Sequence, residues 1–132
     1  MKTILTSNYA RFGDCVRAIA VSVLPPWWYT GQHLPILAPT WDLVRGSKDG
    51  RITNEQYAEE YLALLDKREL TPEDVAHALP EDTVLLCYEK PTDFCHRHVL
   101  AEWLNSSGIV SVSEWLTDKE QQQRKQKQVV DS

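Results

Sequence analysis

The sequence lacks several patterns that commonly identify an enzyme class. With 5 glycines in 132 residues, it contains no glycine-rich dinucleotide loop and no P-loop. It has no Gly-x-Ser-x-Gly motif, so it lacks the nucleophile elbow of an α/β-hydrolase. No apolar run approaches the roughly 20 residues of a membrane span, and residues 1–6 are too short for a secretory signal. We therefore expect a cytoplasmic protein without membrane contact, whose chemistry no familiar motif specifies.

Positive charge and cysteine are also scarce. The net charge is -5, and removing the mildly basic tail (residues 117–132) leaves the rest more acidic still. A duplex-binding protein needs a basic face that displaces counterions, so binding to nucleic acid is not favoured and would need a local patch. The three cysteines are an odd number in a chain without a secretory signal, which predicts reduced thiols rather than disulfides.

What the sequence does contain is an alternation of strand-like and helix-like stretches. The apolar, β-branched stretches typical of strands are residues 2–6, 16–24, 83–88 and 109–113. The helical stretches are residues 54–67, the segment that starts at Thr71-Pro72, and residues 94–105. Such alternation predicts one α/β domain over residues 1–116, a Rossmann-like three-layer fold with a short, mainly parallel sheet flanked by helices. The polar tail, residues 117–132, is expected to be a frayed helix or disordered because it has almost no apolar face.

Residues 25–48 form a long insertion rich in tryptophan and proline. Loops of this length are uncommon unless they act as lids or binding loops. Two interpretations stand beside each other. The insertion either closes over a ligand, or it covers the sheet and buries its tryptophans.

Ligands of an open parallel sheet bind outside the carboxyl ends of the strands. Three of the predicted strands end there in polar or aromatic residues, which are Ser7-Asn8-Tyr9, residues 25–29 and residues 89–93. We therefore expect one shared rim, with Ser7, Asn8 and the aromatic Trp27, Trp28 and Tyr29 among its ligand-binding residues.

The segment of residues 87–98 carries the most chemistry. It leads from an apolar strand into a helix amino terminus, whose free N–H groups and partial positive charge favour an anion. Arg97, in the first helical turn, is suited to a bidentate grip on phosphate or carboxylate. The same field lowers the pKa of a thiol at Cys95, and His96 exchanges protons near neutral pH.

Each of these residues also has a structural interpretation. Cys95 could be a small packing residue, and Glu89 could simply bind a loop amide. His96 lies on the apolar stripe of the helix and could be a satisfied core histidine. Arg97 is the hardest to explain as purely structural, because it lies close to the rim however the helix is rotated.

Zinc is a further alternative. The four candidate ligands in the segment are Cys87, Cys95, His96 and His98. Their spacing has no CxxC or HxxxH element. If the turn is helical, Cys95, His96 and His98 point in different directions and cannot all bind one ion, whereas a looser turn would allow it. The site predicted from the sequence accordingly includes no metal ligand, and the sequence indicates no particular cofactor.

The same residues resemble a known family, domain-of-unknown-function family 488. The resemblance rests on residues 85–91, 94–98 and 101–104, and on the shorter motifs at residues 6–11, 25–29 and 37–39. It implies no particular reaction. The positions that it implies as functional are Ser7, Asn8, Arg11, Cys87, Glu89, Cys95, His96 and Arg97.

Three functions are consistent with this pattern. The first is an enzyme acting on a phosphate-bearing small molecule such as a nucleotide, with Glu89 or His96 as general acid or base and Cys95 as nucleophile. In it, Arg97, Asn8 and the helix amino terminus hold the anion, while the aromatic residues of the rim stack on a ring. The second is a non-catalytic module that binds a nucleotide or a single-stranded end. The third is a structural zinc site in a protein-interaction domain. The oligomeric state is not indicated by the sequence.

Overall fold

A computed structural model describes residues 1–91 and 93–131 of the chain, with side chains of the last helix described up to residue 126. The strands in this part of the chain are β1 (Lys2–Asn8), β2 (Ala18–Ala20), β3 (Gln32–His33), β4 (Val84–Cys87) and β5 (Val110–Glu114). The helices are α1 (Tyr9–Phe12), α2 (Trp41–Lys48), α3 (Asn54–Lys67), α4 (Pro72–Ala78), α5 (His96–Asn105) and α6 (Asp118–Asp131), with a 3-10 helix η1 (Pro35–Leu37).

The five described strands form one sheet in the order β3-β2-β4-β1-β5. Every described pair is parallel, so all the carboxyl ends lie at one edge. The centre of the sheet is β4, whose Val-Leu-Leu-Cys sequence is buried along its whole length, as expected for a strand covered on both faces. The predicted α/β, three-layer arrangement with helices flanking the sheet is confirmed.

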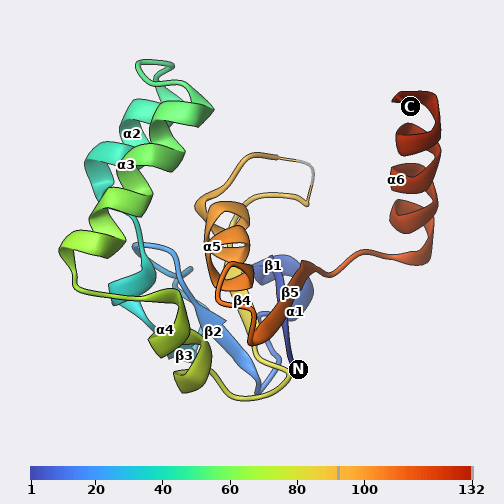
Figure 1. The fold of residues 1–132 in the computed structure, drawn as a ribbon, viewed down its shortest axis with the longest axis horizontal. Coiled ribbons are helices and arrows are strands. Elements are labelled where there is room, and N and C mark those ends of the chain that lie inside the picture. The colour runs from blue at the N-terminus through green and yellow to red at the C-terminus, as the bar shows by residue number, and fades with distance from the viewer. Residues whose placement is uncertain (92, 132) are drawn as a thin grey trace.

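The two faces of the sheet are covered unequally. A large apolar core lies between one face and helices α3, α4 and α5, and includes Ile4, Leu85 and Leu100. The other face carries a smaller cluster around Tyr9 and Leu86, packed under α1 and the segment that follows it. Figure 1 shows α2 and α3 side by side, and α6 standing clear of the sheet at the end of an extended segment. None of the helices in the described ranges combines the length and apolar character that crossing a bilayer requires.

Capping residues explain where the helices begin. Thr53 and Gln56 form a complete capping box at the start of α3, and Thr71 caps α4 with Pro72 at its first position. The predicted span of residues 54–67 is therefore confirmed. Thr40 caps α2 in the same way.

Two sequence predictions were wrong in extent. The stretch of residues 16–24 is a strand only over Ala18–Ala20, so the segment that leaves this strand at the rim is residues 21–24 rather than 25–29. The insertion of residues 25–48 contains β3, η1 and α2 instead of forming one continuous loop. In the tail, Ser132 lies outside the described residues, and Asp118–Asp131 is helical.

Candidate functional site

A pocket of about 280 Å³ lies beside the carboxyl ends of β2 and β4; we call it the strand-end pocket. Aromatic side chains line its walls, namely Trp41, Tyr57, Tyr88 and Phe94. They come from α2, from α3 and from the segment that joins β4 to α5. Tyr88 donates a 2.6 Å hydrogen bond to the Leu24 carbonyl, which ties the segments after β2 and β4 together. Concave sites with flat aromatic walls are typical of small-molecule pockets.

The inner end of the strand-end pocket is chemically different. It is lined by Cys87, Glu89, Cys95 and His96. Cys87 is the last residue of β4, and Cys95 is the N-cap of α5 with an extended backbone (φ -155°, ψ 150°). Because Cys95 stands outside the helix while His96 is the first residue inside it, their side chains converge. Only Cys95 is extended, whereas His96 and His98 are both helical, so the looser turn that would bring all three side chains together does not form.

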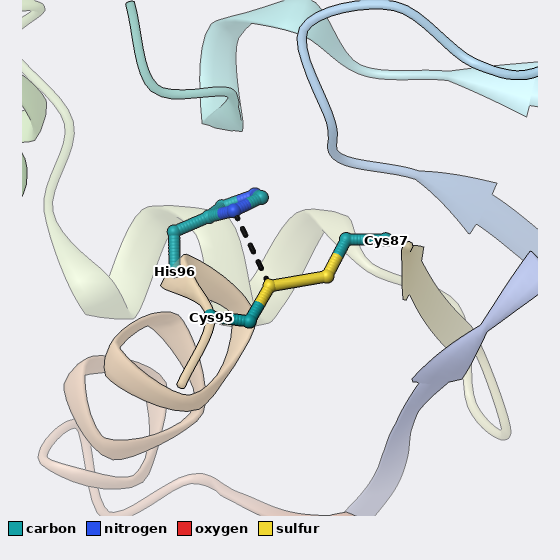
Figure 2. A group of neighbouring side chains, drawn as sticks. All are labelled: Cys87, Cys95 and His96. Carbon is teal, nitrogen blue, oxygen red and sulfur yellow. Dashed lines mark hydrogen bonds between the residues drawn. A yellow bond between two sulfur atoms is a disulfide. The ribbon is translucent and has the colours of Figure 1, made fainter. Parts of the chain in front are cut away.

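His96 is buried, and its hydrogen bonds define its protonation. Its Nε2 lies 2.7 Å from the Val21 carbonyl oxygen. A carbonyl can only accept, so Nε2 carries the proton and Nδ1 keeps a lone pair. Nδ1 lies 3.6 Å from the Cys95 Sγ, as Figure 2 shows. Burial lowers the pKa of His96 to about 4, so the ring is neutral at neutral pH.

The structure joins Cys87 and Cys95 in a disulfide, and Cys15 is free. The expectation of three reduced thiols is therefore wrong for this pair, because the fold brings together two cysteines eight positions apart. The Cys87 Sγ also lies 3.2 Å from Glu89 Oε2. In the bridged state this sulfur has no hydrogen to donate, whereas a reduced Cys87 would have the carboxylate as its acceptor.

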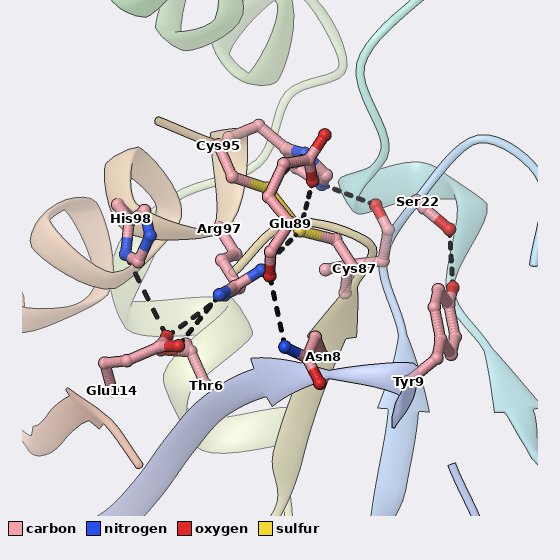
Figure 3. The surroundings of a disulfide bond; sticks show 12 residues. Thr6, Asn8, Tyr9, Ser22, Cys87, Glu89, Cys95, Arg97, His98 and Glu114 are labelled. Atoms are coloured by element: carbon pink, nitrogen blue, oxygen red, sulfur yellow. Dashed lines mark hydrogen bonds and ion pairs between the residues drawn. A yellow bond between two sulfur atoms is a disulfide. The ribbon is translucent and has the colours of Figure 1, made fainter. Parts of the chain in front are cut away.

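Arg97 is fully buried beneath the strand-end pocket. Its Nε and Nη2 donate to the two carboxylate oxygens of Glu114 at 3.0 and 2.8 Å. Its Nη1 lies 2.8 Å from the Cys87 Sγ, so the guanidinium links Glu114 to Cys87 (Figure 3). Thr6 adds a 2.6 Å hydrogen bond to Glu114. Arg97 does not line the pocket, and its binding to a ligand anion stays a prediction.

Of the three ligand-binding residues predicted near the end of β1, Asn8 and Arg11 have protein partners, whereas the buried Ser7 Oγ has no hydrogen-bond partner among the described residues. Ser7 is buried within β1. Asn8 caps α1 by accepting from the Arg11 amide, and its Nδ2 donates to the Glu89 carbonyl at 3.4 Å. Arg11 forms a bidentate pair with Glu120, which raises the pKa of Arg11. Asn8 thus positions the Glu89 segment, and the ligand contacts predicted for these residues are not tested by this geometry.

The aromatic residues predicted to stack on a ligand lie elsewhere. Trp27 is 94% exposed, and neither it nor Trp28 nor Tyr29 lines the strand-end pocket. Trp28 and Tyr29 pack edge-on against Tyr9. Their role as stacking residues stays a prediction.

Three donor atoms have the arrangement of a metal site. Cys87, Cys95 and His96 each offer one atom, and the three atoms lie within 4.8 Å of one another. His98 faces the other way, with its Nδ1 3.9 Å from Glu114. The zinc alternative therefore keeps three of its four candidate ligands.

Several residues of the site were missed from the sequence. Trp41 and Lys48 line the pocket from α2, whose start was visible as Thr40 followed by an acid in the first turn. Glu114, at the end of β5, was visible only as an acid following a short strand. Ser22 lines the pocket and pairs with the Tyr9 hydroxyl, and no sequence signal distinguishes it.

Comparison with known proteins places this geometry in a family. The sequence model described as "Active DUF488-N3 subclade" (DUF488-N3a) matches residues 15–108. The chain belongs to the DUF488-N3a family. The resemblance to family 488 inferred from the sequence is thereby confirmed. No curated protein and no solved structure matches the chain.

The DUF488-N3a match covers the whole strand-end pocket. The residues that line it run from Ser22 to His96, inside the matched span. Ser7, Asn8, Arg11 and Glu114 lie outside that span.

Proposed function

We propose that this DUF488-N3a protein binds a planar, phosphate-bearing small molecule of the nucleotide class in the strand-end pocket and acts on it there. One observation carries the proposal. A single pocket combines aromatic walls with four reactive side chains, Cys87, Glu89, Cys95 and His96, at its inner end. Such a combination is the usual starting point for assigning a catalytic site.

The size of the pocket and its aromatic residues support a planar ligand. A volume of about 280 Å³ is at the small end of ligand sites, so it suits a base or nucleoside rather than a polymer. Trp41 is 49% exposed, which leaves part of its indole free for stacking. Because Glu89 and Cys95 line the same pocket, a ring that stacks on its aromatic walls shares the pocket with these side chains.

Two sources of positive potential support a phosphate group. Lys48 lines the pocket from the last turn of α2. The amino terminus of α5 is the second source, because Cys95 makes no side-chain hydrogen bond to its first N–H groups. Both lie on the pocket wall, unlike the guanidinium of Arg97.

The chemistry proposed at the inner end is proton transfer by Glu89, with the reacting atom near Cys95 and His96. The nucleophilic role predicted for Cys95 requires the reduced thiol, which would lie 3.6 Å from Nδ1 of His96 as its hydrogen-bond acceptor. A binding module without catalysis is the second candidate, since the aromatic walls need no reaction to hold a ring. A ligand recovered unchanged after prolonged incubation would favour that candidate.

The test is thermal unfolding of the full chain against nucleotides, nucleosides and phosphate esters. A ligand at about a hundred times its dissociation constant adds about 2.7 kcal/mol of stability, which is visible as several degrees. Lys48→Ala should lower the shift for phosphate-bearing ligands only. Lys67→Ala is the matched control, because Lys67 also ends a helix but does not line the pocket. Absence of any stabilising ligand, or equal loss in both variants, would contradict the proposal.

A further inference from the structure

We infer that the reduced chain binds one thiophilic divalent ion, best matched by Zn²⁺, through Cys87, Cys95 and His96, with an open fourth position facing the strand-end pocket. The inference deepens the proposed function, on which it rests for the use of that pocket. Soft thiolates and a neutral imidazole are the donors that zinc prefers. Three protein ligands with a free position are the pattern of catalytic rather than structural zinc.

The donor distances fit this ion. Tetrahedral zinc with ordinary Zn–S and Zn–N bonds holds a sulfur and a nitrogen ligand about 3.6 Å apart. The Cys95 Sγ and His96 Nδ1 are 3.6 Å apart. The Cys87 Sγ lies on the far side of Cys95 in Figure 2, within 4.8 Å of both other donors. Two thiolates on one zinc ion lie about 3.8 Å apart. The site therefore forms after a dithiol reductant has supplied two electrons and two protons to the bridge and has itself been oxidised to a disulfide, so that two thiols result and the sulfurs separate.

The imidazole is held ready for coordination. Its Nε2–H donates to the Val21 carbonyl at 2.7 Å, which leaves the lone pair of Nδ1 directed at Cys95. A metal-bound histidine almost always donates its other N–H to a carbonyl or carboxylate in this way. The ring is also fixed by Tyr61, which packs on it edge-on at 5.4 Å.

The charges around the cluster balance. Burying two thiolates is costly unless positive charge accompanies them. A divalent ion neutralises both, and Arg97, which lies 2.8 Å from the Cys87 Sγ, is itself neutralised by Glu114. The buried set of ion, two thiolates, guanidinium and carboxylate therefore carries no net charge. Coordination releases the two thiol protons, one from each cysteine.

The open position makes the ion useful for the proposed reaction. All three ligands line the strand-end pocket, so a small molecule bound there has direct access to the ion. Cys95 and His96 then act as ligands, and Glu89 remains as the proton-transfer residue at the same end of the pocket.

The test titrates Co²⁺ into the reduced, metal-free full chain. The expected result is a thiolate-to-cobalt charge-transfer band and strong visible bands of tetrahedral coordination, saturating at one ion per chain and lost on adding Zn²⁺. Cys87→Ser and Cys95→Ser should each weaken binding by about 100-fold or more. Cys15→Ser should bind normally, because Cys15 belongs to the apolar cluster on the other face of the sheet.

The wild-type titration decides the matter even if a variant fails to fold, which circular dichroism would reveal. A wild type with three titratable thiols but no tetrahedral cobalt spectrum would overturn the inference, as would a Cys15→Ser loss equal to that of Cys95→Ser. The nucleotide panel is run on metal-free protein, so the two proposals fail separately. Ligand binding without a cobalt signal would support the proposed ligand pocket and contradict the metal site. A cobalt signal without ligand binding would support the metal site and contradict the proposed ligand.

Discussion

At the scale of single residues, Arg97 supports the strand-end pocket without lining it. Its guanidinium is fully buried between the Glu114 carboxylate and the Cys87 sulfur. It therefore positions the reactive sulfur from below and links α5 to the ends of β4 and β5. Replacing Arg97 would disturb the residues beneath the pocket. Loss of ligand binding in such a variant would therefore not by itself show that Arg97 contacts an anion.

Removing the Arg97 side chain should be costly. Arg97→Ala leaves the Glu114 carboxylate buried without its partner, and we expect a loss of about 3–5 kcal/mol in the free energy of unfolding. Arg11→Ala breaks a partly exposed bidentate pair with Glu120 and should cost about 1 kcal/mol or less. Urea unfolding of both variants measures the contrast. Equal losses would show that the Arg97 pair is not the buried, dry interaction described here.

Tyr9 provides a pH-dependent prediction. Burial raises its pKa to about 12, so the unfolded chain releases this proton at lower pH than the folded one. The neutral phenol contributes about 2–3 kcal/mol to the free energy of unfolding. This contribution is complete below a pH of about 10 and is lost as the pH rises toward 12. Tyr9→Phe has no such proton, so wild type should lose stability relative to this variant over that interval. If the unfolding free energies of wild type and Tyr9→Phe changed in parallel over this pH interval, the raised pKa of Tyr9 would be contradicted.

Residue types could be predicted at the rim, but side-chain directions could not. The segment of residues 87–98 was expected to carry the site, and Cys87, Glu89, Cys95 and His96 line one pocket. The aromatic lining is different. Trp27 and Trp41 are equally plausible from composition, and only the short β2 and the start of α2 decide that Trp41 lines the pocket while Trp27 faces outward.

At the scale of elements, capping residues in the sequence predicted where two of the helices begin. The span of α3 follows from its capping box, and the start of α4 from Thr71 and Pro72. The ends of β2 do not follow from local chemistry, because β-branched residues recur along the whole of residues 16–24 and only pairing with β4 and β3 limits the strand to Ala18–Ala20. Helix α2 was missed because it lies within a proline-rich insertion, although Thr40 and Asp42 mark its start in the sequence.

The cap of α2 should matter for binding as well as stability. Thr40→Ala removes the hydrogen bond from the Leu43 amide to the Thr40 hydroxyl and should cost about 1 kcal/mol. Since α2 carries Trp41 and Lys48, the affinity for a pocket ligand should fall by several-fold. Thr71→Ala is the matched control, because it uncaps α4, which contributes no residue to the pocket. Unfolding and ligand titration of the two variants would separate the effects, and equal affinities would contradict the role of α2.

At the scale of the whole molecule, the parallel sheet explains why the site is where it is. With every described strand pair parallel, the segments after β2 and β4 meet at one edge, and α5 begins there. Brief apolar stretches alternating with helices were enough to predict this arrangement. The strand order, with β1 between β4 and β5, depends on long-range packing that no local pattern encodes.

The tail should be separable from the domain. The side chains described in α6 are largely exposed, and its Glu120 reaches the body through Arg11. A chain ending at residue 116 should therefore lose about 1 kcal/mol or less in unfolding free energy and bind pocket ligands unchanged. Chemical unfolding of the truncated chain checks this. A large loss of stability would show that the domain boundary is misplaced.

The central claim is that the strand-end pocket holds a planar ligand against Trp41. Quenching of tryptophan fluorescence by a stabilising nucleotide or nucleoside, compared between Trp41→Phe and Trp27→Phe, tests it most directly. The account predicts that quenching is lost with Trp41→Phe and retained with Trp27→Phe, whose indole is exposed outside the pocket. Quenching that disappears with Trp27→Phe and survives Trp41→Phe would place the ligand elsewhere and contradict the claim.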